Sequence, residues 1–417
     1  MPACITVQCP YNRSYEVRLQ RGSHTALGAY LRSLLTDAQH RSNTGAAAHG
    51  ASLVPPRLCI ITDTNVAPHY LDSVEQSLTS SGFQTTHFVI QAGEPSKNLN
   101  TIHDICTYLA EQGFDRHSML VSLGGGVVSD ISGFAAAIFM RGIRVVHVPT
   151  SLLAMVDASV GGKTGVNLAA GKNLLGAFYQ PQGVLIDVDV LQTLPFAELK
   201  SGMGEALKMA MLSTAHASDY LRTLALHLHS LQAGVFNDET LACLEKLVCV
   251  CVQEKARIVA DDEHDTTGTR AFLNYGHTLG HALERVCGYG AMSHGVAVAE
   301  GARFAAFLAQ WLAQQGHTMH DDALHVTSLP CAAFTSLSHF VTEQTRLLDA
   351  LDFAPFFRGY AQSDSNFCRN ILEAMHHDKK AHNGSIVFIL PDEDGNLRLQ
   401  VVEDALIDQA LHAYCAV

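Results

Sequence analysis

Short apolar runs alternate with amphipathic segments through the first half of the chain. A short hairpin is predicted at residues 5–17. Five later runs have strand character, at residues 57–62, 83–90, 119–123, 144–148 and 183–187. Segments with helical apolar spacing separate most of them. Strands that alternate with helices predict a parallel sheet whose binding loops lie at its carboxyl edge.

The pattern changes after Leu194-Pro195. From residue 196 to about residue 374, helical spacing is found almost everywhere and no segment has convincing strand character. A strand pair returns at residues 386–402. We therefore predict an α/β fold of two domains: a Rossmann-like nucleotide-binding domain at residues 1–195, and a mostly helical domain at residues 196–417.

Length, charge and cysteine content narrow the range of functions. At 417 residues the chain exceeds the roughly 250–300 residues that one core usually serves. The net charge of −13 argues against nucleic acid or an anionic membrane as the main partner, although clustered lysines can still bind a small anion. Eleven cysteines without a CxxC pair suggest reduced thiols in a cytosol. Neither a signal peptide nor an apolar run near the ~18 residues of a membrane span is evident, so we expect a cytoplasmic protein.

A glycine turn follows the third predicted strand. The apolar run 119–123 ends in Gly124-Gly125-Gly126, and a helix rich in small residues follows. This arrangement brings backbone N–H groups and the positive end of a helix against a phosphate. A complete GxGxxG motif would need glycine in place of Ser129. On this motif alone, a dinucleotide site and a plain tight turn remain equally open.

Two lysines lie in glycine-rich segments further on, which we interpret as loops. Lys163 follows Gly161-Gly162, and Lys172 precedes Asn173. Each is a candidate anchor for carboxylate or phosphate oxygens, and a solvated loop lysine is the alternative for each. Lys163 is the more informative, because its surroundings are too apolar to leave an ammonium group unpaired.

The helical domain contains a candidate metal site. Glu205 and Lys208 share a helix face among apolar neighbours, although a surface ion pair is the alternative. His277 and His281 have the i, i+4 spacing that can share a metal, without the glutamate of HExxH, and His294 adds a third imidazole. Glu205, His277 and His294 would give zinc two nitrogens and one oxygen and leave positions open for a substrate oxygen. The alternative is that the HxxxH spacing is incidental, because the chain contains 23 histidines.

Together these segments resemble the 3-dehydroquinate synthase family, which catalyses the second step of the shikimate pathway. The resemblance runs from about Leu58 to Gly301 and resumes near Met375. Residues 39–56 and 310–370 carry no motif of the family. The chain departs from the family pattern at Ser129, Gly204 and Val296. The matching motifs are GGGVVSD (124–130), MRG (140–142), VPTSLLAMVDASVGGKTGVN (148–167), GKNLLGAFYQP (171–181), NYGHTLGHALE (274–284), SHG (293–295) and DKK (378–380).

The resemblance implies a cyclase that converts 3-deoxy-D-arabino-heptulosonate 7-phosphate to 3-dehydroquinate and phosphate. NAD would oxidise the C5 hydroxyl and become NADH. Phosphate would then leave by elimination, and NADH would return the hydride, which regenerates NAD. A divalent metal would assist, zinc or alternatively cobalt. Residues 1–195 would then bind NAD, and residues 196–417 would bind the metal and the substrate.

Carried over by position, the resemblance implies roles for individual residues. The metal ligands would be Glu205, His277 and His294. The NAD-binding residues would be Asp63, Glu94, Lys97, Gly125, Gly126, Val127, Asp130, Thr150, Ser151, Lys163 and Lys172. The residues that line the substrate would be Asp157, Lys163, Lys172, Asn173, Lys208, Lys255, Arg270, Asn274, His281 and Lys379. His281 is thus assigned to the substrate and not to the metal.

The family works as a homodimer, and its MRG arginine reaches the substrate phosphate in the neighbouring subunit's site. Here that residue is Arg141, in a short turn between a small-residue helix and a strand. A long planar cation there could project across an interface towards a phosphate. The alternative is that Arg141 caps the C-terminus of its own helix.

Other interpretations remain open. Glycerol-type, metal-dependent alcohol dehydrogenases share the fold and release NADH, but lack the lysine-rich GGKTGVN…GKN segment. Other sugar phosphate cyclases, which act on sedoheptulose 7-phosphate, share that segment and differ around the second histidine of HTLGH. A non-enzymatic binding protein is disfavoured, because every reactive position is filled. The sequence leaves open whether the chain was once part of a larger multifunctional polypeptide.

Overall fold

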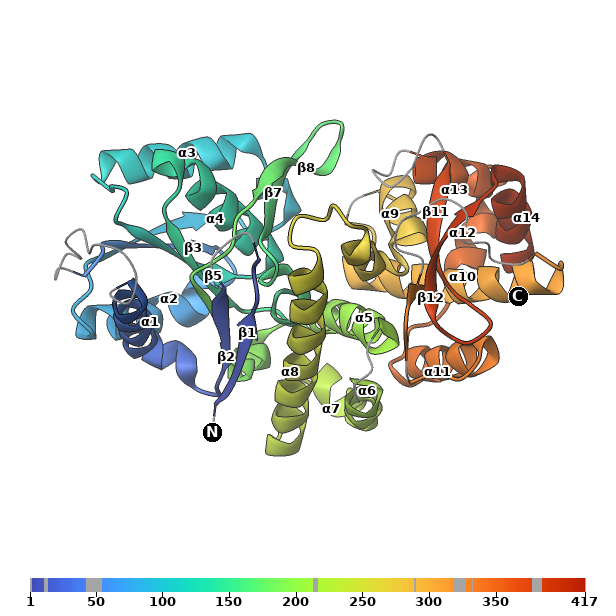
Figure 1. Ribbon diagram of the computed structural model, residues 1–417, viewed down its shortest axis with the longest axis horizontal. Helices are drawn as coiled ribbons and strands as arrows, with labels where there is room; N and C mark the ends of the chain where they lie inside the picture. Colours follow the sequence, from blue (N-terminus) through green and yellow to red (C-terminus); the bar gives the residue numbers. More distant parts are fainter. Residues whose placement is uncertain are drawn as a thin grey trace. The chain divides into compact units, whose positions relative to one another are not determined.

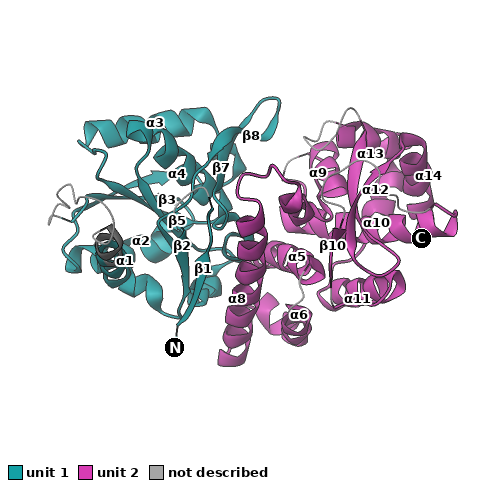
Figure 2. Ribbon diagram, viewed as in Figure 1, with its two compact units in different colours: residues 1–194 teal, residues 195–417 magenta. Residues whose placement is uncertain are grey.

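The computed structural model describes residues 2–10, 14–42, 55–212, 217–288, 290–317, 328–331, 333–376 and 385–416. The chain divides into two units, Met1–Leu194 and Pro195–Val417, which Figure 2 colours separately. Within the described ranges, no helix combines the length and the apolar character needed to cross a membrane.

A seven-stranded sheet forms the centre of the first unit (Figure 1). Its strand order is β1-β2-β9-β6-β5-β3-β4, and every neighbouring pair is parallel except β1 with β2. The predicted hairpin and the five predicted strands are confirmed. Their bounds are β1 (Ala3–Val7), β2 (Tyr15–Leu19), β3 (Leu58–Asp63), β4 (Thr85–Ile90), β5 (Met119–Gly124), β6 (Arg144–Pro149) and β9 (Gly183–Ile186).

Helices connect these strands and cover the sheet. Cys59 and Ile61 of β3 pack in one core with side chains of α3 and α4. Leu58 and Ile60 point to the other face and are also buried, as expected for a parallel sheet covered on both sides. The helical elements are η1 (Ser23–Ala26), α1 (Leu27–Ser42), α2 (Ala67–Ser80), η2 (Glu94–Ser96), α3 (Leu99–Glu111), α4 (Gly126–Ile138), η3 (Phe139–Arg141), the π-helical turn η4 (Ala154–Ala158) and η5 (Val188–Thr193).

The interpretation of residues 39–56 as a loop is wrong at its start, because α1 continues to Ser42. Residues 43–54 lie outside the described part of the chain.

The two lysine-containing segments form a β-hairpin, so their interpretation as loops is wrong. Its strands are β7 (Lys163–Leu168) and β8 (Gly171–Phe178). Gly165 pairs with Gly176, and a Cβ atom at Gly176 would lie 1.9 Å from the backbone oxygen of Thr164. Glycine is therefore used here for close approach of two strands, whereas glycine content by itself suggests a loop.

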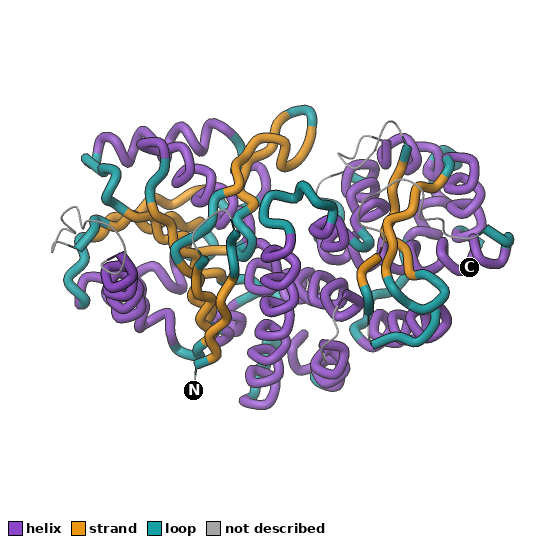
Figure 3. The backbone as a smooth tube through the Cα atoms, viewed as in Figure 1, coloured by secondary structure: helices purple, strands orange, loops and turns teal. Residues whose placement is uncertain are grey.

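The second unit is mostly helical, as predicted, with a small sheet (Figure 3). The strand pair β11 (Ile386–Pro391) and β12 (Leu397–Val402) is confirmed. The prediction missed β10 (Ser328–Leu329), which pairs with β12 and is too short to show an alternating pattern. The helices are α5 (Phe196–Leu212), α6 (Ala217–Leu226), α7 (Leu228–Gln232), α8 (Asp238–Asp261), η6 (Thr269–Asn274), α9 (His277–Val286), α10 (His294–Gln314), α11 (Leu337–Ala350), α12 (Phe357–Ser363), α13 (Phe367–His376) and α14 (Asp404–Tyr414).

Candidate active site

Three helices of the second unit meet backbone to backbone at glycines. A Cβ atom at Gly204 of α5 would lie 2.2 Å from the carbonyl oxygen of Gly295 in α10. A Cβ atom at Gly301 of α10 would lie 1.8 Å from the carbonyl oxygen of Gly276, which precedes α9. Such contacts exclude any side chain. Glycine at position 204, a departure from the family pattern, is therefore required by this crossing.

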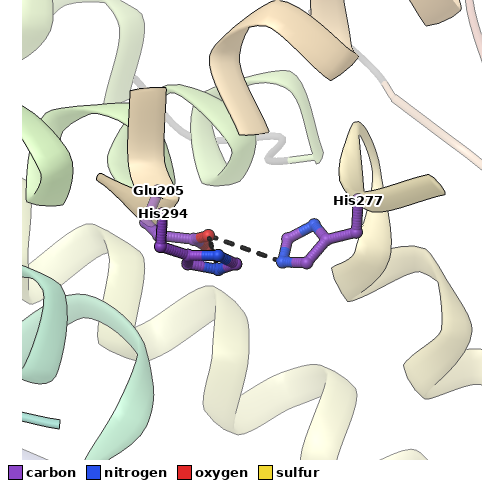
Figure 4. A group of neighbouring side chains, drawn as sticks. All are labelled: Glu205, His277 and His294. Atoms are coloured by element: carbon purple, nitrogen blue, oxygen red, sulfur yellow. Dashed lines mark ion pairs between the residues drawn. The ribbon is translucent and has the colours of Figure 1, made fainter. Parts of the chain in front are cut away.

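The residues that adjoin these glycines form a compact group of possible metal ligands. Glu205, His277 and His294 each place a ligand atom within 4.8 Å of the other two. Figure 4 shows both imidazoles directed towards the Glu205 carboxylate. The Nε2 atoms of His277 and His294 lie 3.5 Å and 3.2 Å from Oε1 of Glu205. The close crossing of α5, α9 and α10 thus brings together residues separated by up to 89 positions in the sequence.

Both histidines are held by hydrogen bonds at the other ring nitrogen. Nδ1 of His277 lies 3.1 Å from the carbonyl oxygen of Tyr275, and Nδ1 of His294 lies 3.2 Å from Oε2 of Glu284. Because both partners are acceptors, each Nδ1 carries a proton and donates it. The lone pair of a neutral ring is then on Nε2, the atom that faces Glu205. Ligating histidines in metal sites are usually held in this way.

Sequence reasoning missed Glu284, although it lies within the quoted NYGHTLGHALE motif. It follows His277 by seven residues and His281 by three, so helical periodicity places it on the same face of α9. That spacing could have identified it. Its carboxylate, buried beside His294, also belongs to a second group of possible ligands with His281 and His294.

The predicted pair of Glu205 and Lys208 is buried, so the alternative of a surface ion pair is wrong. Nζ of Lys208 lies 2.5 Å from Oε2 of Glu205, and each side chain is only 2% exposed. Burial raises the pKa of Glu205, but the Lys208 ammonium and His294 outweigh it and hold the pKa far below the usual range. Glu205 is therefore a permanent carboxylate in an apolar crossing.

His294 has the opposite shift. Burial lowers its pKa, but hydrogen bonds and charge from Glu205 and Glu284 outweigh burial and raise it to about 9. In the metal-free protein His294 is thus a cation between two carboxylates. A metal ion that binds its Nε2 must displace that proton, so metal binding releases a proton at neutral pH.

The group fits a zinc ion. Both oxygens of Glu205 are buried, and the Lys208 ammonium and the imidazoles of His277 and His294 surround them. One carboxylate oxygen and two imidazole nitrogens are typical zinc ligands, and three protein ligands are typical of a catalytic site with an open position.

The other predicted site residues of the second unit take several positions. The ring of His281 lies 5.2 Å from that of His277 and 5.9 Å from that of His294, measured between centroids. Lys255 on α8 and Arg270 on η6 are buried, and Asn274 at the end of η6 is half-buried. The guanidinium of Arg270 donates to the carbonyl oxygen of Glu263. Lys379, with its DKK motif, lies outside the described residues.

In the first unit, the glycine turn joins β5 to α4 as predicted. Gly125 precedes α4 without any side-chain cap, so the first N–H groups of the helix can receive an anion. Gly126 and Val127 begin the helix. Ser129 is buried, and its hydroxyl donates to the carbonyl oxygen of Gly125. Because Ser129 points inwards, glycine is not needed there, and the incomplete GxGxxG motif does not weaken the case for a phosphate site.

Further predicted NAD-binding residues gather at the carboxyl ends of β3, β5 and β6. Asp63 ends β3, and its Oδ1 accepts hydrogen bonds from Asn65 and Val66. Thr150 and Ser151 follow β6, and the Thr150 amide donates to the carbonyl oxygen of Gly124. Carboxyl ends of parallel strands are the usual site of nucleotide binding.

The buried Lys97 forms an ion pair with the half-buried Asp130 beside this turn. Burial lowers the pKa of Lys97, but Asp130 and Glu94 outweigh it and raise the pKa, so the lysine stays charged. Glu94 accepts a hydrogen bond from Nδ2 of Asn167 at 2.7 Å. These contacts connect η2, α4 and β7.

The remaining predicted residues of the first unit lie on the hairpin and its surroundings. Lys163 is exposed at the start of β7, so the prediction that its surroundings are apolar is wrong. Lys172 is half-buried on β8. Asn173 is exposed and has a positive φ of 53°. Asp157 is half-buried in η4.

Arg141 is exposed in the turn between α4 and β6. Met140 and Arg141 both have positive φ angles, 51° and 67°, which are uncommon for residues other than glycine. Such backbone geometry persists only where surrounding structure imposes it, and it is concentrated at functional sites.

Comparisons with known proteins agree on one family. The family described as 3-dehydroquinate synthase N-terminal matches residues 87–201, and the one described as 3-dehydroquinate synthase C-terminal matches residues 202–351. A 3-dehydroquinate synthase from Rhodopirellula baltica is 40% identical over 340 residues, which cover 82% of this chain and 81% of the relative.

Two solved structures share the fold. A 2-deoxy-scyllo-inosose synthase, complexed with carbaglucose-6-phosphate, NAD+ and Co2+, has a TM-score of 0.72 at 23% identity and covers 99% of both chains. The 2-epi-5-epi-valiolone synthase ValA from Streptomyces hygroscopicus subsp. jinggangensis, with NAD+ and Zn2+ bound, has a TM-score of 0.71 at 22% identity and covers 98% of both chains. These neighbours confirm the predicted α/β fold.

Proposed function

The chain belongs to the 3-dehydroquinate synthase family, and from this premise we infer that it converts 3-deoxy-D-arabino-heptulosonate 7-phosphate to 3-dehydroquinate and inorganic phosphate. NAD and a divalent metal, zinc or cobalt, are its cofactors, as in the solved structures of similar fold. The observation that carries this inference is the group of possible metal ligands formed by Glu205, His277 and His294, with His281 beside it.

We assign the metal to Glu205, His277 and His294. When bound, the ion would stabilise negative charge that develops on substrate oxygens. Lys208 fixes the Glu205 carboxylate by its ion pair, and we propose that its ammonium group also binds the anionic substrate. His281 can exchange a proton with the substrate, because its ring lies next to the ligand histidines. The further residues proposed to bind the substrate in this unit are Lys255, Arg270, Asn274 and Lys379.

In the first unit we propose the glycine turn as the site of the NAD pyrophosphate. The uncapped start of α4 at Gly125, Gly126 and Val127 would donate backbone N–H groups to it. Bound NAD would supply a reversible hydride acceptor. The other residues proposed to hold it are Asp63, Glu94, Lys97, Asp130, Thr150, Ser151, Lys163 and Lys172. Asp157, Lys163, Lys172 and Asn173 are proposed to contact the substrate.

The phosphorylated sugar acid explains why an acidic chain carries these basic groups. The net charge is −13, yet Lys97 and Lys208 are buried and charged beside carboxylates. Such local cations can bind phosphate and carboxylate oxygens in spite of the overall sign.

We further propose that the enzyme is a cytoplasmic homodimer in which Arg141 reaches the phosphate in the active site of the partner subunit. In support, Arg141 is exposed in a turn with imposed backbone geometry, and its neighbours Ile138 and Met140 are 46% and 53% exposed, as expected for an apolar contact surface. In support of the cytoplasm, none of the eleven cysteines, all within the described ranges, takes part in a disulfide.

One assay tests the reaction. The zinc-loaded enzyme is incubated with the seven-carbon phosphate and with NAD far below the substrate concentration. We expect many phosphates released per NAD, 3-dehydroquinate as product, and no net absorbance from NADH. Accumulation of one NADH per substrate would instead indicate a dehydrogenase, and turnover of sedoheptulose 7-phosphate in its place would indicate another cyclase of this fold.

A mixing experiment tests the position of Arg141. Homodimers of Arg141→Ala and of Glu205→Ala should both be nearly inactive. A mixed dimer restores one intact site of its two, and random exchange makes half of the dimers mixed, so activity should recover to roughly a quarter of the wild-type value. If the chains exchange and activity stays at the level of the single variants, Arg141 does not act across the interface.

A further inference from the structure

Asn167 lies where the pairing of the β7–β8 hairpin is irregular. The register pairs Val166 with Leu175, and Leu168 with Gly171. One residue of β7, Asn167, therefore faces three residues of β8, at positions 172–174. A bulge of this kind redirects side chains and is frequent next to active sites. This bulge contains Lys172 and Asn173, both proposed site residues.

Asn167 makes three hydrogen bonds, one within this bulge and two to the segment 94–97. Its side-chain oxygen accepts from the backbone N–H of Asn173 at 2.8 Å. Its side-chain nitrogen donates to Oε1 of Glu94 at 2.7 Å. Its backbone N–H donates to the carbonyl oxygen of Lys97 at 2.8 Å. The Asn167 side chain thus supplies a hydrogen bond to β8 where the backbone pairing of β7 and β8 is interrupted. It also binds Glu94 at the start of η2.

The side-chain amide serves both of its partners at once. It accepts through oxygen from a backbone N–H and donates through nitrogen to a carboxylate. Aspartate at position 167 could still accept from Asn173, but would place a second negative charge against Glu94. Alanine would lose both hydrogen bonds, including the one that the positive-φ backbone of Asn173 donates.

We propose that Asn167 is a positioning residue that couples NAD binding to the geometry of the substrate-binding bulge. The inference rests on the proposed function, in which Glu94 and Lys97 bind NAD while Lys172 and Asn173 bind the substrate. When NAD orders Glu94, Asn167 transmits that order to Asn173. By linkage, the substrate must then favour NAD binding by the same factor, and such couplings are typically about 5- to 150-fold.

The test uses the zinc-loaded enzyme with NAD as the only added ligand. Hydrogen exchange of peptides that cover β8 is measured with and without NAD, and NAD affinity is measured by calorimetry. In the wild type, we expect NAD to slow exchange across residues 171–178. In Asn167→Ala, NAD should bind about tenfold more weakly and leave that exchange unchanged. Asn167→Asp should keep the slow basal exchange of β8, because Asp accepts from Asn173, but should weaken NAD binding.

Asn100→Ala provides the matched control, because Asn100 is an exposed asparagine on α3 in the same unit. It should behave as the wild type in both measurements. Unchanged melting temperature and zinc content in Asn167→Asp show that the fold is retained even where Asn167→Ala is unstable. The inference is overturned if NAD fails to slow β8 exchange in the wild type, or if it still slows that exchange in the Asn167 variants.

Failure of the proposed function gives a different result. Glu94→Ala should weaken NAD binding whether or not Asn167 transmits the effect. If Glu94→Ala leaves NAD affinity unchanged, the assignment of Glu94 to NAD is wrong. If Glu94→Ala weakens NAD binding but NAD does not slow hydrogen exchange of β8 in the wild type, Glu94 binds NAD and the proposed coupling through Asn167 is wrong. In steady state, Asn167→Ala should raise the KM values of NAD and substrate more than it lowers kcat. The substitution loosens the positions of binding residues but removes no group that takes part in the reaction.

Discussion

The two units build their candidate sites in different ways. In the first unit the proposed NAD residues lie on turns at the carboxyl edge of a sheet, and many are half-exposed and held by hydrogen bonds to the backbone. In the second unit the proposed metal ligands lie inside a crossing of three helices, where Glu205 and Lys208 are almost fully buried. A turn at a sheet edge can adjust to a substitution. A crossing of helices in backbone contact has no room to do so.

Two histidines, His147 in the first unit and the half-buried His294 in the second, show the same contrast for a single residue type. Burial alone lowers the pKa of His147, on β6 of the first unit, to about 4, and its Nδ1 has no hydrogen-bond partner. In the second unit, two carboxylates outweigh burial and raise the pKa of His294 to about 9. The charge of each imidazole is therefore decided by its hydrogen-bond and ionic partners. An imidazole in the core without partners stays neutral, whereas an imidazole between two carboxylates stays protonated.

The largest expected effect comes from crowding the helix crossing. Gly204→Ala places a methyl group 2.2 Å from the carbonyl oxygen of Gly295, so α5 and α10 must separate. Because Glu205 and His294 adjoin this contact, we expect loss of most bound zinc and a fall in turnover of about a hundredfold or more, as displacement of about 1 Å in a site can cause. Elemental mass spectrometry measures the bound zinc, and the rate of phosphate release measures the turnover.

Gly359→Ala is the control for this substitution. Gly359 is also a helical glycine of the second unit, but a Cβ atom there would meet nothing within 4 Å. It should keep full zinc and activity and gain stability by up to about 1 kcal/mol from helix propensity. If Gly204→Ala behaves like this control, backbone contact does not set the metal site.

The next largest effect is the acid sensitivity that His147 gives to the first unit. The unfolded chain binds a proton on this residue below about pH 6.5, whereas the folded unit binds it only near pH 4. Stability therefore falls as the pH drops through this window, by up to about 3 kcal/mol. His147→Leu should remove this loss. Hydrogen exchange of β5 and β6, compared with the wild type at pH 7.5 and again at pH 4.5, measures it.

His103→Gln is the control for His147, because the His103 side chain is 78% exposed. The control should keep the wild-type loss of protection at pH 4.5. Equal loss in His147→Leu and in the wild type would show that other groups cause the acid sensitivity.

A smaller effect is expected at Glu284, which acts on the metal only through His294. Glu284→Gln removes the carboxylate that accepts from Nδ1 of His294. Loss of such a partner typically weakens metal binding by about 10- to 100-fold. Competition with a chromophoric chelator measures the zinc affinity. Glu373→Gln, an exposed glutamate on α13, should bind zinc as the wild type does; equal affinities in all three proteins would remove Glu284 from the site.

Apolar patterning was sufficient for the strands and most helices, because burial on one or two faces leaves a periodic trace in the sequence. It failed for β7 and β8, where Gly165 and Gly176 serve strand contact, and for β10, which has only two residues. For the site, spacing indicated the pair of Glu205 and Lys208, but it could not place Glu205 beside His277 or His294. That proximity depends on how three helices cross. The part played by Asn167 depends on a bulge, which local sequence does not reveal.

The smallest expected effect lies at the position where the sequence departs from GxGxxG. Ser129→Gly completes the motif, so a rule based on the motif predicts tighter NAD binding. In the structure the Ser129 side chain is buried within the first turns of α4, and its hydroxyl donates to the carbonyl oxygen of Gly125. We therefore expect the NAD dissociation constant, measured by calorimetry, to stay within about twofold of the wild-type value, with stability reduced by about 0.5–1 kcal/mol for glycine within a helix. Tenfold tighter NAD binding would show that the sheet-edge site is as sensitive to single residues as the helix crossing.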